Sequence, residues 1–135
     1  MKRCAVLIVN SDHRRRGYRA ALEGRGFRVT ETSDWPDDDV VKAHEVVIVV
    51  LRHISVMTAL AARMRAKRGF GHRVLIGVSP SPPTPGDRRT GTIAGFDEIV
   101  ADSEASRTLI AHILRRLRAR PEHRCLLPDR KPSAA

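Results

Sequence analysis

Three short, continuous runs of apolar residues constrain the fold of this 135-residue chain more than any other feature of its sequence. They cover residues 5–9 (AVLIV), 46–51 (VVIVVL) and 74–78 (VLIGV). A strand that keeps one face in water alternates apolar and polar residues, whereas a continuous apolar run is typical of a strand covered on both faces. The three runs therefore predict the central strands of a sheet with helices on both sides.

Two less apolar segments predict strands at the borders of the same sheet. Residues 27–32 (FRVTET) alternate only briefly and then turn polar on both sides, which is typical of a short edge strand. Residues 97–101 (DEIVA) predict a last strand on the other side. The sequence thus predicts a sheet of five strands.

The segments between the strands predict helices, because apolar residues recur there at helical spacing between capping and terminating residues. These helices are expected over residues 14–24, 36–43, 56–68 and 104–120. Alternation of strands and helices favours an open parallel α/β sheet. With the second strand at an edge, the order is 2-1-3-4-5, which is a flavodoxin-like three-layer α/β/α sandwich.

One connection departs from this alternation. Residues 80–94, between the fourth and fifth strands, include Pro80, Pro82, Pro83 and Pro85. Proline lacks the N–H that a helix interior requires. We therefore expect the fourth helix to be shortened or replaced by a Pro-rich loop, with at most one short turn after Gly86.

Length and apolar content predict one domain over residues 1–120 and a polar, disordered tail over residues 121–135. No apolar run approaches the roughly 18 residues that a membrane helix needs, and the N-terminus lacks the pattern of a signal peptide. We expect a cytoplasmic protein. Cys4 and Cys125 have no metal-ligand spacing, and in that compartment they would be reduced.

The formal net charge of +10 indicates an acidic protein or a nucleic acid as partner. The arginines are scattered along the chain, and the few aromatic residues are not interleaved with a basic run. Proteins that bind single strands need aromatic stacking platforms. Nucleic-acid binding through the arginines therefore stays as an alternative to protein binding.

Four segments together resemble the receiver domain of two-component response regulators, the CheY-like family. They are VLIVNSDH (6–13), HEVVIVVLRHI (44–54), VLIGVS (74–79) and GFDEIVADS (95–103). In that family the first strand ends in an acidic pair, the third in the phosphate-accepting Asp, the fourth in Thr or Ser, and the fifth in Lys followed by Pro. The resemblance spans roughly residues 3–119 and implies a signalling domain.

The residues at the matching positions do not suit phosphotransfer. The matching positions are Asn10, Ser11, Asp12, Val50, Ser79 and Asp102. An alkyl side chain such as Val50 cannot form an acyl phosphate, one carboxylate at Asp12 is a poor magnesium cage, and Asp102 would repel the phosphate that the family's Lys binds. The resemblance therefore implies a phosphorylation-independent pseudo-receiver that is not an enzyme and needs no metal or cofactor.

The resemblance also indicates a partner surface, because receivers use the fourth helix, fifth strand and fifth helix to dimerise or to meet partners. In this chain the matching candidates are Phe96, Arg107, Arg115 and Arg118. We expect a protein partner or a homodimer there.

A second alternative is a small-ligand-binding or enzymatic flavodoxin-like domain. In that case His13 and His53, in loops expected to meet at the sheet edge, would form a metal or acid–base site with Asp12 and Asp102 nearby. The segment SDHRRRG (11–17) matches the cobalamin-binding pattern of this fold poorly, and a P-loop is absent.

Overall fold

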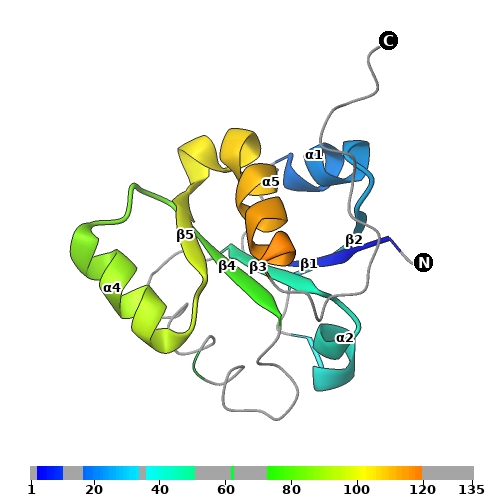
Figure 1. Cartoon of the computed structure of the whole chain (residues 1–135), viewed down its shortest axis with the longest axis horizontal. Coiled ribbons are helices and arrows are strands. Elements are labelled where there is room, and N and C mark those ends of the chain that lie inside the picture. Colours follow the sequence, from blue (N-terminus) through cyan, green and yellow to red (C-terminus); the bar gives the residue numbers. More distant parts are fainter. Residues whose placement is uncertain (1–2, 11–16, 34–35, 51–61, 63–72, 120–135) are drawn as a thin grey trace.

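The protein forms an α/β sandwich around one parallel sheet (Figure 1). The structure is a computed structural model, and it describes residues 3–10, 17–33, 36–50, 62 and 73–119. The sheet has the order β2-β1-β3-β4-β5, and every neighbouring pair is parallel. The strands are β1 (Ala5–Asn10), β2 (Arg28–Thr32), β3 (Val46–Val50), β4 (Val74–Ser79) and β5 (Glu98–Ala101). The predicted fold class and strand order are confirmed.

Four helices are described, and they are α1 (Tyr18–Gly24), α2 (Asp38–Lys42), α4 (Pro85–Ala94) and α5 (Asp102–Arg118). Helix α1 begins later than the predicted residue 14, because Gly17 before it has a left-handed φ of 75°. The helix predicted over 56–68 and the tail 121–135 lie outside the described residues, except for residue 62. Within the described residues, no helix combines the length and apolar character needed to cross a membrane.

The core consists of two apolar layers, one on each face of the sheet. Successive strand residues point to opposite faces, and the two buried clusters divide the strand residues in this way. One cluster joins strand residues such as Ile8 to Leu22 of α1 and Leu109 of α5, and Figure 1 shows these two helices on the same side of the sheet. The other cluster joins strand residues such as Leu7 to Val41 of α2 and to the connection between α4 and β5.

The prediction of at most one short turn after Gly86 was wrong. Helix α4 has 10 residues, and the prolines at 80, 82 and 83 precede it. The hydroxyl of Thr84 accepts from the N–H of Asp87, whose carboxylate accepts from the N–H of Thr84, both at 3.0 Å. This capping box satisfies the first free N–H groups, and Pro85 suits the first helical position, where no N–H is needed.

The expectation of a reduced thiol at Cys4 was also wrong. Cys4 is fully buried in the α1/α5 layer and is disulfide-bonded. The sequence contains one other cysteine, Cys125, which lies outside the described residues.

Candidate functional site

The sheet brings four of the six predicted pocket residues to one edge. Parallel strands place their carboxyl ends together, and the register sets Asn10 beside Val50, Val50 beside Val78, and Ser79 beside Ala101. Asp102 follows Ala101 as the first residue of α5. The other predicted residues at this edge, Ser11, Asp12, His13 and His53, lie outside the described residues.

The end of β3 carries a hydrocarbon side chain. Val50 is 4% exposed and belongs to the apolar layer under α1 and α5. A phosphoryl acceptor needs an oxygen or nitrogen nucleophile, and valine has none. The side chain at the end of β3 is therefore part of the core.

Ser79, at the end of β4, is bonded within its own loop. Its side chain is buried, and its hydroxyl donates to the carbonyl of Ser81 at 2.7 Å. The bond fixes the first turn of the chain toward α4, since Ser79 ends β4 and Ser81 lies three residues before Thr84. The hydroxyl of Ser79 is thus engaged in a contact within its own loop.

Asp102 has a partner that sequence reasoning missed. The hydroxyl of Tyr18, the first residue of α1, donates to the carboxylate of Asp102, the first residue of α5. Tyr18 is buried, so this bond ties the two helices together at the carboxyl edge of the sheet. The sequence carries no signal for this pairing, because the two residues lie 84 positions apart along the chain.

The described part of this edge offers little to a cation. Among the described residues, no group of three or more His, Cys, Asp or Glu side chains could hold a metal ion. An acyl-phosphate site also needs a positive charge to hold the phosphoryl oxygens, and Asp102 brings a negative one. The described residues at the carboxyl edge therefore suit packing rather than phosphoryl chemistry.

The second predicted site is the partner surface around α4, β5 and α5. One of the residues predicted for it, Phe96, is buried. Phe96 is 3% exposed and belongs to the apolar layer near α4. Gly95 ends α4 with a left-handed φ of 118°, and the next N–H, of Phe96, donates back to the carbonyl of Gly91 at 2.9 Å. This helix end directs the ring inward, so the prediction that Phe96 forms part of an exposed partner surface was wrong.

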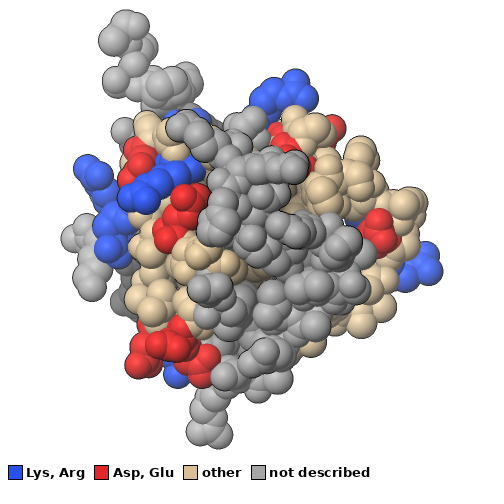
Figure 2. Space-filling model, turned by 180° about the vertical axis from the view of Figure 1, so that it is seen from behind, with Lys and Arg blue, Asp and Glu red and all other residues tan. Residues whose placement is uncertain are grey.

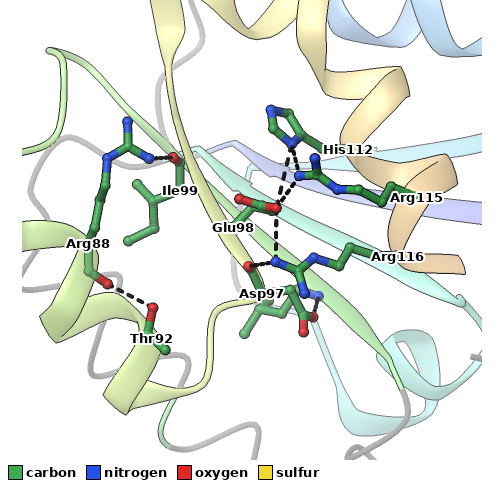
Figure 3. A network of polar contacts seen from close by, with 9 residues as sticks. Arg88, Thr92, Asp97, Glu98, Ile99, His112, Arg115 and Arg116 are labelled. Atoms are coloured by element: carbon green, nitrogen blue, oxygen red, sulfur yellow. Dashed lines mark hydrogen bonds and ion pairs between the residues drawn. The ribbon is translucent and has the colours of Figure 1, made fainter. Parts of the chain in front are cut away.

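Glu98 forms the centre of a polar network between β5 and α5 (Figure 3). One oxygen of its carboxylate accepts from Nη2 of Arg115 at 2.5 Å and from Nη2 of Arg116 at 2.9 Å. Nδ1 of His112 lies 3.6 Å from the same oxygen and 2.8 Å from Nη2 of Arg115. Arg116 also donates to the carbonyl of Asp97 at 2.8 Å.

The network lowers the pKa of Glu98. Burial of the carboxylate acts to raise the pKa, but the hydrogen bonds from Arg116 and Arg115, with the charges of Arg116 and His112, outweigh burial. Glu98 is therefore charged at neutral pH and holds both guanidinium groups. The sequence did not reveal this, because Glu98 stood only as part of a predicted strand.

The three predicted partner-binding arginines differ in their surroundings. Arg107 and Arg118 are exposed on α5. The side chain of Arg115 is 62% exposed, but its guanidinium is bonded to Glu98. Arg107 and Arg118 are thus available to a partner, whereas Arg115 already has an acidic partner within the chain.

The described residues of the face seen in Figure 2 do not form one continuous basic surface. The described Lys and Arg side chains lie in separate groups around its rim, with Asp and Glu side chains beside several of them. A duplex or single strand would need a continuous basic track, which the described residues of this face do not form.

Similarity to known proteins is found at the level of structure. No protein-family model matches the sequence, and no curated protein matches it. An orphan response regulator of H. pylori matches with a TM-score of 0.68 at 20% identity, over 84% of this chain and 96% of that chain. A response regulator from Thermotoga maritima matches with a TM-score of 0.72 at 15% identity, over 86% and 98%.

A third solved structure, described as an atypical orphan response regulator with a phosphorylation-independent regulatory mechanism, has a TM-score of 0.69 and 21% identity. It aligns over 84% of this chain and 95% of that chain. These similarities show the fold alone, since all three identities are low. The chain has the five-stranded, flavodoxin-like fold of CheY-like receiver domains.

Proposed function

We propose that this protein is a phosphorylation-independent pseudo-receiver, a signalling or scaffolding module that acts through protein contacts and is not an enzyme. The observation that carries the proposal is Val50, a buried alkyl side chain at the end of β3. Ser79 and Asp102 support it, because their polar groups are bonded to Ser81 and Tyr18. The description of one structural neighbour as phosphorylation-independent agrees with it.

The proposal is tested by attempted phosphorylation. The purified chain would be incubated with acetyl phosphate and Mg²⁺ and its intact mass measured, with an intact receiver domain as the positive control. We expect the control to gain a phosphoryl group and this chain to gain none. A gain in mass that hydroxylamine removes would reveal an acyl phosphate on a carboxylate of this chain, and the proposal would be wrong.

The surface that we propose for protein contact borders β5. This strand is an edge of the described sheet, α4 and α5 pack against it, and the two helices contribute to opposite apolar layers. Arg107 and Arg118 are exposed on α5. Replacement of Arg107 and Arg118 by Glu is expected to abolish partner binding in a pull-down.

Nucleic-acid binding is the second candidate, favoured by the net charge of +10. Nucleic-acid binding through the arginines would show an affinity for DNA or RNA that falls steeply as the salt concentration rises and depends little on base sequence. A fluorescence-anisotropy titration with a random duplex and a random single strand at several salt concentrations tests it directly.

A further inference from the structure

The imidazole of His112 lies between a guanidinium and a carboxylate. Its ring nitrogen Nδ1 is 2.8 Å from Nη2 of Arg115 and 3.6 Å from Oε1 of Glu98 (Figure 3). A guanidinium can only donate hydrogen bonds, so Nδ1 is the acceptor in the shorter contact. The ring in this arrangement is therefore neutral, carries its proton on Nε2, and helps to hold the guanidinium that Glu98 binds.

A proton on Nδ1 would reverse this contact. Histidine is the side chain whose ordinary charge change falls between pH 5 and pH 8. A protonated Nδ1 cannot accept from Arg115, and two positive groups 2.8 Å apart repel each other. The new N–H would instead reach Oε1 of Glu98 after a movement of less than about 1 Å. Glu98 stays a carboxylate over this range, because its pKa is lowered.

Competition at one oxygen decides which partner of Glu98 leaves. Its Oε1 already accepts from Arg115 and Arg116, and a third donor would exceed the roughly two lone pairs of that atom. Arg116 is held a second time by the carbonyl of Asp97, at 2.8 Å, and its side chain is 38% exposed. The side chain of Arg115 is 62% exposed, so water can take over its hydrogen bonds. A protonated His112 therefore displaces Arg115.

The other described groups near His112 leave Glu98 as the acid that it faces. On α5 itself, the neighbours at helical spacing are Arg115 and Arg116 on one side and the uncharged Thr108 on the other. The described elements packed most closely against α5 are β4, β5 and α1. Strand β4 has no acidic or basic side chain, and Glu98 is the charged residue of β5. The carboxylate of Asp97, just before β5, accepts from a backbone N–H of β4.

Helix α1 meets α5 at a distance from His112. Tyr18 donates to Asp102, which lies about 15 Å along α5 from His112 at the ordinary helical rise. The charged residues of α1, Arg19 and Glu23, form an ion pair with each other at 3.4 Å. The contact between α1 and α5 is therefore separate from the network around Glu98.

We propose that His112 is a pH-sensitive switch that holds Arg115 on Glu98 when neutral, and that takes the place of Arg115 and releases its guanidinium to solvent when protonated. The proton comes from solvent and binds Nδ1, and no covalent bond of the chain breaks. Glu98 keeps Arg116 and one further cationic partner in either state, so α5 stays attached to β5. Mild acidification thus exposes an additional free guanidinium on α5. The inference goes beyond the proposed function and does not depend on it.

The first test determines which nitrogen carries the proton. Long-range ¹H–¹⁵N spectra of the full, ¹⁵N-labelled chain distinguish the two neutral tautomers, and the signals that His112→Gln removes are those of His112. At about pH 8 we expect His112 to carry its proton on Nε2. His44 is the internal control, because its Nδ1 lies 2.7 Å from the carbonyl of Val40 and must donate there. A neutral His112 with its proton on Nδ1 would overturn the inference.

The second test follows the guanidinium groups by ¹⁵N NMR at about pH 8 and about pH 5. Rotation about the Nε–Cζ bond of Arg115 should accelerate at least about fivefold at the lower pH, as for loss of an exposed ion pair. Rotation in Arg116 should stay slow at both. The matched variant is His112→Gln, which keeps an acceptor but cannot be protonated, and in it Arg115 should stay slow at both pH values. An Arg115 that stays slow in the unaltered chain at the lower pH, or that accelerates equally in His112→Gln, would overturn the inference.

Discussion

Replacement of Glu98 by Gln tests whether the network of Figure 3 stabilises the domain. The carboxylate is 17% exposed and accepts from two guanidinium groups, of which Arg116 is 38% exposed and Arg115 62% exposed. Hydrogen bonds to charged groups contribute about 1.5–3 kcal/mol when sheltered, but an exposed ion pair such as that of Arg115 contributes about 0–1 kcal/mol. Gln keeps an acceptor oxygen and removes the charge.

We therefore expect Glu98→Gln to lower the free energy of unfolding by about 1–2 kcal/mol at neutral pH. This corresponds to a fall in Tm of about 3–10 °C for a domain of this size. Urea denaturation followed by circular dichroism measures it, and Glu104→Gln is the matched control. Glu104 is exposed, so its variant should stay within about 0.5 kcal/mol of the unaltered chain.

The pH dependence has a definite sign. The pKa of Glu98 is lower in the folded chain, so its charge stabilises the fold above the pKa of an unfolded glutamate. That contribution is lost as the pH falls through the folded pKa. The difference between the unaltered chain and Glu98→Gln should therefore shrink on acidification. A difference that stayed constant down to low pH, or a Glu104→Gln variant equally destabilised, would refute the assignment.

Three further changes probe other parts of the fold. Tyr18→Phe removes the donor to Asp102 and should cost about 1–2 kcal/mol in urea denaturation; an unchanged midpoint would contradict a stabilising bond. Gly91→Ala should destabilise by about 1–2 kcal/mol in the same assay, because an added Cβ would lie 2.0 Å from Cδ1 of buried Ile99. A more stable variant would show that the side chain of Ile99 can move aside at little energetic cost. Free-thiol titration of the unfolded, unreduced chain should find no thiol at Cys4; a reactive thiol would agree with the reducing cytoplasm expected from the sequence.

The layers and strand order could be predicted, because they depend on runs of apolar residues in which every position favours the same buried strand. The run Val46–Val50 is buried at all five positions, as a continuous apolar run requires. The start of the fourth helix could not be predicted by counting prolines, since where the helix begins depends on one capping pair, Thr84 with Asp87. Four prolines in a short segment predict a loop, although three of them precede the helix and Pro85 favours its first turn.

At the candidate site, the positions of the strand ends could be predicted from the sequence, but the contacts between side chains could not. The position of Val50 followed from the length of its strand, because a strand end is set by local sequence. The burial of Phe96 depended on the left-handed turn at Gly95, which sends the next side chain inward. The pairing of Glu98 with arginines 17 and 18 residues later depended on how α5 lies across β5, which periodicity does not give.

These missed contacts share one consequence for how the domain would work. Helix α4 is fixed at its start by Thr84 and Asp87, in its middle by the close approach of Gly91 to Ile99, and along its side by Arg88, which donates to the carbonyl of Ile99 at 3.2 Å. Helix α5 is fixed to β5 through Glu98 and to α1 through Asp102. Under the proposed function, a phosphoryl switch would have to break such contacts, and the alkyl side chain of Val50 provides no acceptor atom through which phosphorylation could supply the free energy. The exposed arginines of α5, Arg107 and Arg118, lie outside these contacts, so any attraction of theirs to a charged partner would depend on salt.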